Sequence, residues 1–209
     1  MKAILLHGWP LSERMWVPQV TALRQNGVEP LMPHLYGRGP SIDSWAAQLL
    51  RDFDEPLVAV GASMGGYCAL ALARRAPERI VGMVLVGSRA SGDTFDRRRQ
   101  RDLQIAALRA RGVPPELETD ESAEDLAVAQ EAIRDRMDLS GVAASFGGPL
   151  LVCIGDQDPI VSVEESRELA SGALRGSIEV FPGVGHFVSV DQPDRFNAVL
   201  LEFLSQWQT

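Results

Sequence analysis

A serine stands between two glycines at the point where a strand pattern gives way to a helix pattern. The stretch GASMG, residues 61–65, follows the apolar run 56–60 and precedes an alanine-rich stretch of helical character. A strand that reverses directly into a helix strains the residue at the bend, and small neighbours let the two segments approach each other. The pattern G-x-S-x-G in this context predicts a nucleophile at Ser63, presented beside the amino terminus of a helix.

A serine hydroxyl needs a base to take its proton, and the base needs a carboxylate to orient it. Of the three histidines, His186 lies in a glycine-containing loop after the last strand pattern, and we expect it to be the base. His7 and His34 lie on other loops at the same edge, so position alone does not exclude them, although a structural role is favoured for both. Asp156 and Asp158 both follow the preceding strand pattern, and either could orient the imidazole. The order serine, aspartate, histidine is the one that this architecture requires.

Short, almost continuously apolar runs recur along the chain, and helical patterns separate most of them. Such runs are typical of strands buried on both faces, and their alternation with helices predicts an α/β fold with a doubly wound, mostly parallel sheet. In such a sheet the ligand site forms beyond the carboxyl ends of the strands. The predicted strands are 2–6, 28–32, 56–60, 80–86, 149–154 and 177–181, and the predicted helices are 13–25, 41–51, 64–75, 162–171 and 193–206.

The alternation breaks once, over residues 89–146. We interpret this segment as a helical lid inserted into a single domain that spans 1–209. One helix would end at Gly112, and a second would begin at Ser122. The apolar face of the second helix would consist of Leu126, Ala129, Ile133 and Met137.

Opposite charges gather on this predicted lid. The cluster RRRQR, residues 97–101, could hold an anionic substrate, but the favoured interpretation is a solvated helix face that pairs with the acidic stretch 116–125.

The composition excludes several classes of partner. A net charge of −8 argues against nucleic acid or an anionic membrane, since both need clustered positive charge. The amino-terminal apolar run is too short for a signal peptide, and no stretch approaches the roughly 20 apolar residues of a membrane span, so we expect a cytoplasmic protein. Cys68 and Cys153 are expected to be buried free thiols.

Together these motifs resemble the α/β-hydrolase superfamily over nearly the whole chain, in particular the small bacterial esterase and enol-lactonase branch with a helical lid. The sheet would be a compact version of about six strands, because no hairpin precedes the first strand. A further departure is His34, which stands where many members carry an acid. The matching stretches are HGWP (7–10), GASMGG (61–66), GDQDP (155–159) and GVGHF (183–187).

The resemblance implies roles for individual residues. Ser63 would be the nucleophile and His186 the base. Asp158, the fourth residue of G-x-x-D, would be the acid in preference to Asp156. The backbone N–H groups of Trp9 and Met64 would form the oxyanion hole, and no metal or organic cofactor is implied.

The expected function is hydrolysis of carboxylic esters of small or medium acyl groups through an acyl-enzyme, by a monomer or homodimer whose partner is a small-molecule ester or lactone. Alternatives on the same triad are a lactone (enol-lactone) hydrolase, a carbon–carbon bond hydrolase and a perhydrolase. A protein of this fold could also be a non-catalytic ligand-binding module. An apolar substrate pocket is expected from the residues that flank the catalytic loops, namely Trp9, Leu11, Ile160, Val161 and Phe187.

Overall fold

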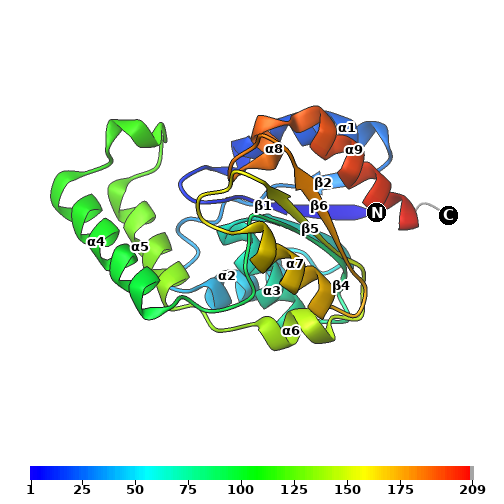
Figure 1. The fold of residues 1–209 in the computed structure, drawn as a ribbon, viewed down its shortest axis with the longest axis horizontal. Helices are drawn as coiled ribbons and strands as arrows, with labels where there is room; N and C mark the ends of the chain where they lie inside the picture. Colours follow the sequence, from blue (N-terminus) through cyan, green and yellow to red (C-terminus); the bar gives the residue numbers. More distant parts are fainter. Residues whose placement is uncertain (208–209) are drawn as a thin grey trace.

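The computed structural model describes residues 1–207, which are built around one six-stranded sheet (Figure 1). The strand order is β2-β1-β3-β4-β5-β6, and every neighbouring pair is parallel, as the sequence predicts. The third strand runs two residues further than predicted and leads directly into the GASMG turn. The strands are β1 (Lys2–Leu6), β2 (Glu29–Leu31), β3 (Leu57–Ala62), β4 (Ile80–Val86), β5 (Leu150–Gly155) and β6 (Gly176–Phe181).

Helices cover both faces of the sheet, with α1 and α9 on one face and α2, α3 and α7 on the other (Figure 1). Successive strand residues point to opposite faces, so Ala3 and Leu5 pack towards α1 and α9, whereas Ile4 and Leu6 pack towards α2 and α3. Burial on both faces explains why the strands read as continuous apolar runs. These helices are α1 (Val17–Gln25), α2 (Ile42–Asp52), α3 (Met64–Arg75), α7 (Val163–Gly172) and α9 (Pro193–Leu204).

Three short elements modify the predicted helix ends. The predicted helix 13–25 is divided into the 3-10 turn η1 (Glu13–Trp16) and α1. The short helix α8 (Val188–Asp191) precedes α9, and the 3-10 turn η3 (Ser205–Trp207) follows it. Cys68 in α3 and Cys153 in β5 are buried free thiols, as predicted.

The segment between β4 and β5 has two parts. Helix α4 (Phe95–Arg111), the turn η2 (Pro115–Leu117) and helix α5 (Ala123–Arg134) form a hairpin beyond the carboxyl ends of the strands (Figure 1). Helix α6 (Ser140–Ser145) instead packs against α3 and α7, beside the sheet. Within residues 1–207, no helix is both long enough and apolar enough to cross a membrane.

The hairpin helices agree with the sequence prediction at both predicted ends and at every residue of the predicted apolar face but one. Gly112 ends α4 with a φ of 80°, and the Ser122 hydroxyl caps α5. Leu126, Ala129 and Ile133 are buried, as expected for its apolar face. The prediction for Met137 is wrong, because α5 ends at Arg134 and the Met137 side chain, 55% exposed, lies beyond the helix.

Candidate active site

The turn between β3 and α3 holds Ser63 in a conformation that residues other than glycine seldom adopt, with φ 49° and ψ −110°. Glycine is needed on both sides of it. A Cβ atom at Gly65 would collide with the Leu6 carbonyl of β1, and one at Gly61 would collide with the Gly65 backbone. The Ser63 N–H donates to the Val86 carbonyl of β4 at 2.7 Å. The chain is therefore bent sharply at Ser63, bonded to β4 and packed closely against β1.

The imidazole of His186 lies against Asp158, in the loops that follow β6 and β5. His186 Nδ1 is 2.7 Å from Asp158 Oδ2. The other carboxylate oxygen, Oδ1, accepts from the backbone N–H groups of Ile160 at 2.7 Å and Val161 at 3.1 Å. The Asp158 side chain is fully buried. Because these bonds fix the carboxylate, it can orient the imidazole and stabilise its charged form.

Asp156, the other candidate acid, has a different position. Its Oδ1 accepts from the Gly183 N–H at 2.7 Å, which braces the loop that leads to His186. The Nε2 atom of His186 is buried and has no hydrogen-bond partner among residues 1–207. Ser63 and His186 line one cavity. The structure thus brings Ser63, His186 and Asp158 together and leaves Nε2 able to take a proton.

The two backbone N–H groups expected to form an oxyanion hole come from different elements of the same edge. Met64 is the first residue of α3, and the N–H groups of a first helical turn have no partner within the helix. Trp9 follows Gly8 after β1 and lines the same cavity, and its indole N–H donates to the Leu126 carbonyl of α5 at 3.2 Å. A Cβ atom at Gly8 would collide with the ring of Phe187, so glycine lets this loop approach the histidine loop closely.

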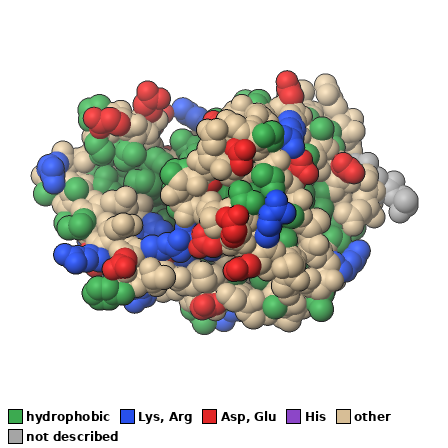
Figure 2. All heavy atoms as spheres, viewed as in Figure 1, with side chains coloured by type: hydrophobic (Ala, Val, Ile, Leu, Met, Phe, Trp, Pro, Cys, Tyr) green, Lys and Arg blue, Asp and Glu red, His purple; other side chains and the backbone are tan. Residues whose placement is uncertain are grey.

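The cavity above Ser63, called here the Ser63 cavity, has a volume of about 300 Å³ and lies between the sheet edge and the α4–α5 hairpin. Figure 2 shows charged side chains of both signs where the hairpin meets the body of the molecule. The wall of the cavity is mostly polar. It is formed by Trp9, Ser63, Arg89, Pro159, Ile160 and His186 from loops, by Tyr67 from α3, and by Arg97, Gln100, Arg101, Gln104, Gln130 and Ile133 from the hairpin.

The predicted apolar wall is therefore wrong in most of its members. Trp9 and Ile160 line the cavity, but Leu11, Val161 and Phe187 do not. Leu11 and Phe187 pack against the apolar core between the sheet and α1 and α9, and Val161 is buried. These three side chains lie away from the cavity, and residues of the hairpin form much of its wall instead.

One face of α4 carries the polar side chains. Residues 97, 100, 101 and 104 have the spacing of neighbours on one helix face. Arg97 pairs with Glu165 at 3.3 Å, and Arg101 pairs with Asp93. Neither acid belongs to the acidic stretch 116–125. The favoured interpretation of the RRRQR cluster, a solvated face paired with that stretch, is therefore wrong for these two arginines.

Sequence reasoning missed Arg89, which lines the Ser63 cavity and is only 4% exposed. It lies three residues after the end of β4. Its position in the sequence could have predicted a place in the site, because loops at the carboxyl ends of parallel strands form ligand sites.

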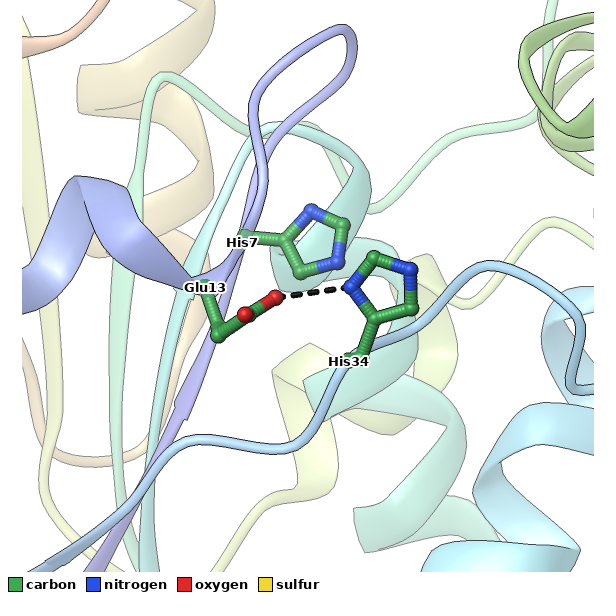
Figure 3. A group of neighbouring side chains, drawn as sticks. All are labelled: His7, Glu13 and His34. Atoms are coloured by element: carbon green, nitrogen blue, oxygen red, sulfur yellow. Dashed lines mark hydrogen bonds and ion pairs between the residues drawn. The ribbon is translucent and has the colours of Figure 1, made fainter. Parts of the chain in front are cut away.

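A second polar group at this edge consists of His7, Glu13 and His34, which come from the end of β1, from η1 and from the loop after β2 (Figure 3). Their potential ligand atoms lie within 4.8 Å of one another. However, His7 Nε2 accepts from the Leu35 N–H at 2.9 Å, which leaves the proton on Nδ1, 3.3 Å from the Gly8 carbonyl. Burial also lowers the pKa of His7 to about 4. Both nitrogens of this neutral ring are engaged, so His7 has a structural role and offers no ligand to a metal ion.

Comparison with known proteins places the chain in a family. It belongs to the alpha/beta hydrolase family, whose sequence model matches residues 3–199. An esterase from Thermogutta terrifontis has the same fold, with a TM-score of 0.90 and 25% sequence identity over 100% of this chain and 91% of that one.

Two similar sequences are pimeloyl-[acyl-carrier protein] methyl ester esterases. That of Aromatoleum aromaticum is 36% identical over 41% of this chain, and the match spans only 36% of the relative's length. That of Photobacterium profundum is 26% identical over 96% of this chain and 93% of its own length. The resemblance stated from the motifs is confirmed at the level of the family.

Proposed function

We propose that this chain is a serine hydrolase that cleaves carboxylic esters of small or medium acyl groups through an acyl-enzyme. The observation that carries the proposal is the 2.7 Å bond between His186 and Asp158 in the same site as the strained Ser63. A fixed carboxylate, an imidazole with a free Nε2 and a hydroxyl on a sharp turn are the parts that acyl transfer needs.

In the first half-reaction, His186 Nε2 takes the proton of the Ser63 hydroxyl as the oxygen attacks the acyl carbon. The carbonyl oxygen gains a negative charge between the N–H groups of Trp9 and Met64, each of which contributes about 3 kcal/mol to the stabilisation of the transition state. His186 then gives the proton to the leaving alcohol as the ester bond breaks. In the second half-reaction, water loses a proton to Nε2 and attacks the acyl-enzyme, which releases the acid and restores Ser63.

The acyl chain has an apolar place to lie. A second cavity of about 410 Å³ runs along α4 and η2, and it shares Trp9 and Gln104 with the Ser63 cavity. An acyl chain that leaves the catalytic serine past Trp9 would bury its methylene groups there, each contributing about 0.8 kcal/mol. The apolar side chains of this second cavity are Ala107, Leu108, Val113, Pro114, Pro115 and Leu117.

The names of the relatives support an ester as the substrate class, since two of them are methyl ester esterases. Opening a lactone ring would use the same steps, because a lactone is a cyclic ester.

The test compares purified wild-type protein with Ser63→Ala on p-nitrophenyl esters of increasing acyl length. We expect sustained turnover by the wild type and a loss in kcat of about 10⁴-fold or more in the variant. Ser145→Ala is the matched control, because its hydroxyl is exposed and, among the described residues, bonds to carbonyls of its own helix. Turnover that survives Ser63→Ala would contradict the proposed nucleophile, and a single reaction without turnover would indicate a binding module.

A further inference from the structure

Arg89 is a buried cation whose hydrogen bonds are incomplete. Its Nη2 donates to the Ile160 carbonyl, and its Nε lies 3.4 Å from Glu165 Oε1, an ion pair outside hydrogen-bond geometry. Its Nη1 is buried without any partner in the part of the chain that the structure describes. A buried donor left unpaired costs about 1–3 kcal/mol, and more when it is charged. A charged donor that no described residue satisfies, on a side chain that lines the Ser63 cavity, points to a ligand.

Positive charges exceed negative charges around Arg89, which also favours an anionic ligand. Arg89 and Arg97 share Glu165, at 3.4 Å and 3.3 Å. Arg101 and Arg136 share Asp93, whose side chain is fully buried. Four guanidinium groups thus face two carboxylates, and the guanidinium groups remain in excess when Asp158 beneath His186 is counted as a third.

Arg89, Arg97 and Arg101 all line the Ser63 cavity, and among the described residues no aspartate or glutamate lines it. Burial lowers the pKa of Arg89, and the nearby Arg97 acts in the same direction, whereas Tyr67 and Glu165 oppose the change. An anion in the cavity would relieve this repulsion, because opposite charges attract strongly where water is excluded.

We propose that the substrate of the Ser63 site is an ester that carries a carboxylate, bound by Arg89 and Arg97 while the ester group lies at Ser63. This inference rests on the proposed function and adds the charge of the substrate to it. The carboxylate oxygens accept from Arg89 Nη1 and from the Arg97 guanidinium. Arg101 is held by Asp93 and by Gln130, whose Oε1 accepts from Arg101 Nη1 at 2.6 Å, so it contributes charge rather than a free donor.

The experiment uses pairs of esters that differ in charge. Monomethyl succinate carries the carboxylate on the acyl side, and dimethyl succinate is its neutral counterpart. O-butanoylglycolate carries it on the alcohol side, and propyl butanoate is the neutral counterpart. The acids released are quantified by chromatography for the wild type, Arg89→Gln, Arg97→Gln and Ser63→Ala.

We expect the wild type to prefer the charged ester in at least one pair, and the preferred pair tells which half of the substrate carries the charge. Each arginine variant should lower the charged-to-neutral ratio of kcat/KM by about 10- to 100-fold, as expected for a charge-assisted hydrogen bond. Arg97→Gln provides the result if the buried Arg89 proves necessary for folding. Arg99→Gln is the matched control, because Arg99 is exposed on the same helix and does not line the cavity.

Ser63-dependent hydrolysis with no preference for charge in either pair would overturn the inference and leave the proposed function standing. An equal effect of Arg99→Gln and Arg97→Gln would also overturn it, since it would indicate a general field effect. Absence of Ser63-dependent hydrolysis of every ester would instead overturn the proposed function, and the inference with it.

Discussion

The carboxyl edge of the sheet and the α4–α5 hairpin form the two walls of the same cavity, and they are stabilised in different ways. At the sheet edge, backbone geometry sets each position: Ser63 is held at φ 49°, and glycines permit contacts that no other residue would allow. The hairpin is held by a seam of apolar side chains and by ion pairs on its exposed surface, such as those of Arg109 and Arg134. Under the proposed function, the sheet edge supplies the reacting groups, and the substrate charge is bound jointly by Arg89 of the loop after β4 and Arg97 of the hairpin.

This difference matches what each wall has to do. A base and a nucleophile must be held within a fraction of an ångström, and residues on loops that directly follow strands are positioned by the sheet itself. A charged group of a substrate can be met by a long guanidinium in several orientations. Changes at the sheet edge should therefore have large effects, and exposed changes on the hairpin should have small ones.

The largest expected effect separates the two aspartates of the loop after β5. Asp158→Asn should lower kcat by about 10³- to 10⁴-fold, because an amide cannot stabilise the imidazolium and favours the wrong tautomer of His186. Asp156→Asn is the matched control. It removes the same charge two residues away, from a carboxylate whose side-chain hydrogen bond within residues 1–207 is to the Gly183 N–H, and we expect a loss of less than about tenfold. The kcat values of the two variants are measured by steady-state kinetics on one p-nitrophenyl ester. Equal losses of kcat would contradict a specific role of Asp158 in orienting His186.

The fold and the positions of Ser63, Asp158 and His186 could be predicted because each depends on short local patterns. A buried parallel strand is a run of apolar residues, and the residue that follows it is at the ligand-binding edge. The orientations of Leu11 and Phe187 could not be predicted in the same way, since a loop side chain can point into the cavity or back into the core.

The role of the arginines in the RRRQR cluster was harder to predict for a further reason. Whether a charged helix face is solvated or lines a cavity depends on how the helix docks, and α4 docks through Ile105 and Leu108, on the same helix as RRRQR. The prediction for Met137 was wrong because the helical spacing of the sequence continues past Arg134, and no glycine or proline marks the end of the helix.

The second expected effect concerns acid stability and the buried His7 at the sheet edge. Burial lowers the pKa of His7 from its ordinary value of 6.5 to about 4, so the folded protein keeps this ring neutral. Between these two pH values the unfolded chain binds a proton that the folded protein does not, so the free energy of unfolding falls as the pH falls. The contribution of His7 to the free energy of unfolding is complete above pH 6.5, and about 3 kcal/mol of that contribution is lost by pH 4.

Denaturant unfolding of the wild type and His7→Gln across this pH range measures the effect. The variant should be less stable at pH 7 and should lose less stability on acidification, because glutamine does not titrate. Glu13, His34 and Glu121 form ion pairs beside His7 in both proteins, so only the difference between the two curves is assigned to His7. Parallel curves would mean that His7 binds its proton equally in both states. NMR titration of the His7 ring gives its pKa directly.

The smallest effect is expected on the hairpin, where Arg109 of α4 reaches Glu124 and Glu131 of α5 at 2.8 Å each. These are exposed pairs, which water and salt screen, so Arg109→Gln should leave the melting temperature unchanged within error. The neighbouring Leu108→Ala is the contrast. Leu108 is buried in the apolar seam, and its truncation should cost about 2–5 kcal/mol. If Arg109→Gln destabilises the protein as much as Leu108→Ala, the charged surface rather than the apolar seam holds the hairpin. The arginines of its inner face would then have to be reconsidered as structural, because the same kind of ion pair would be enough to explain them.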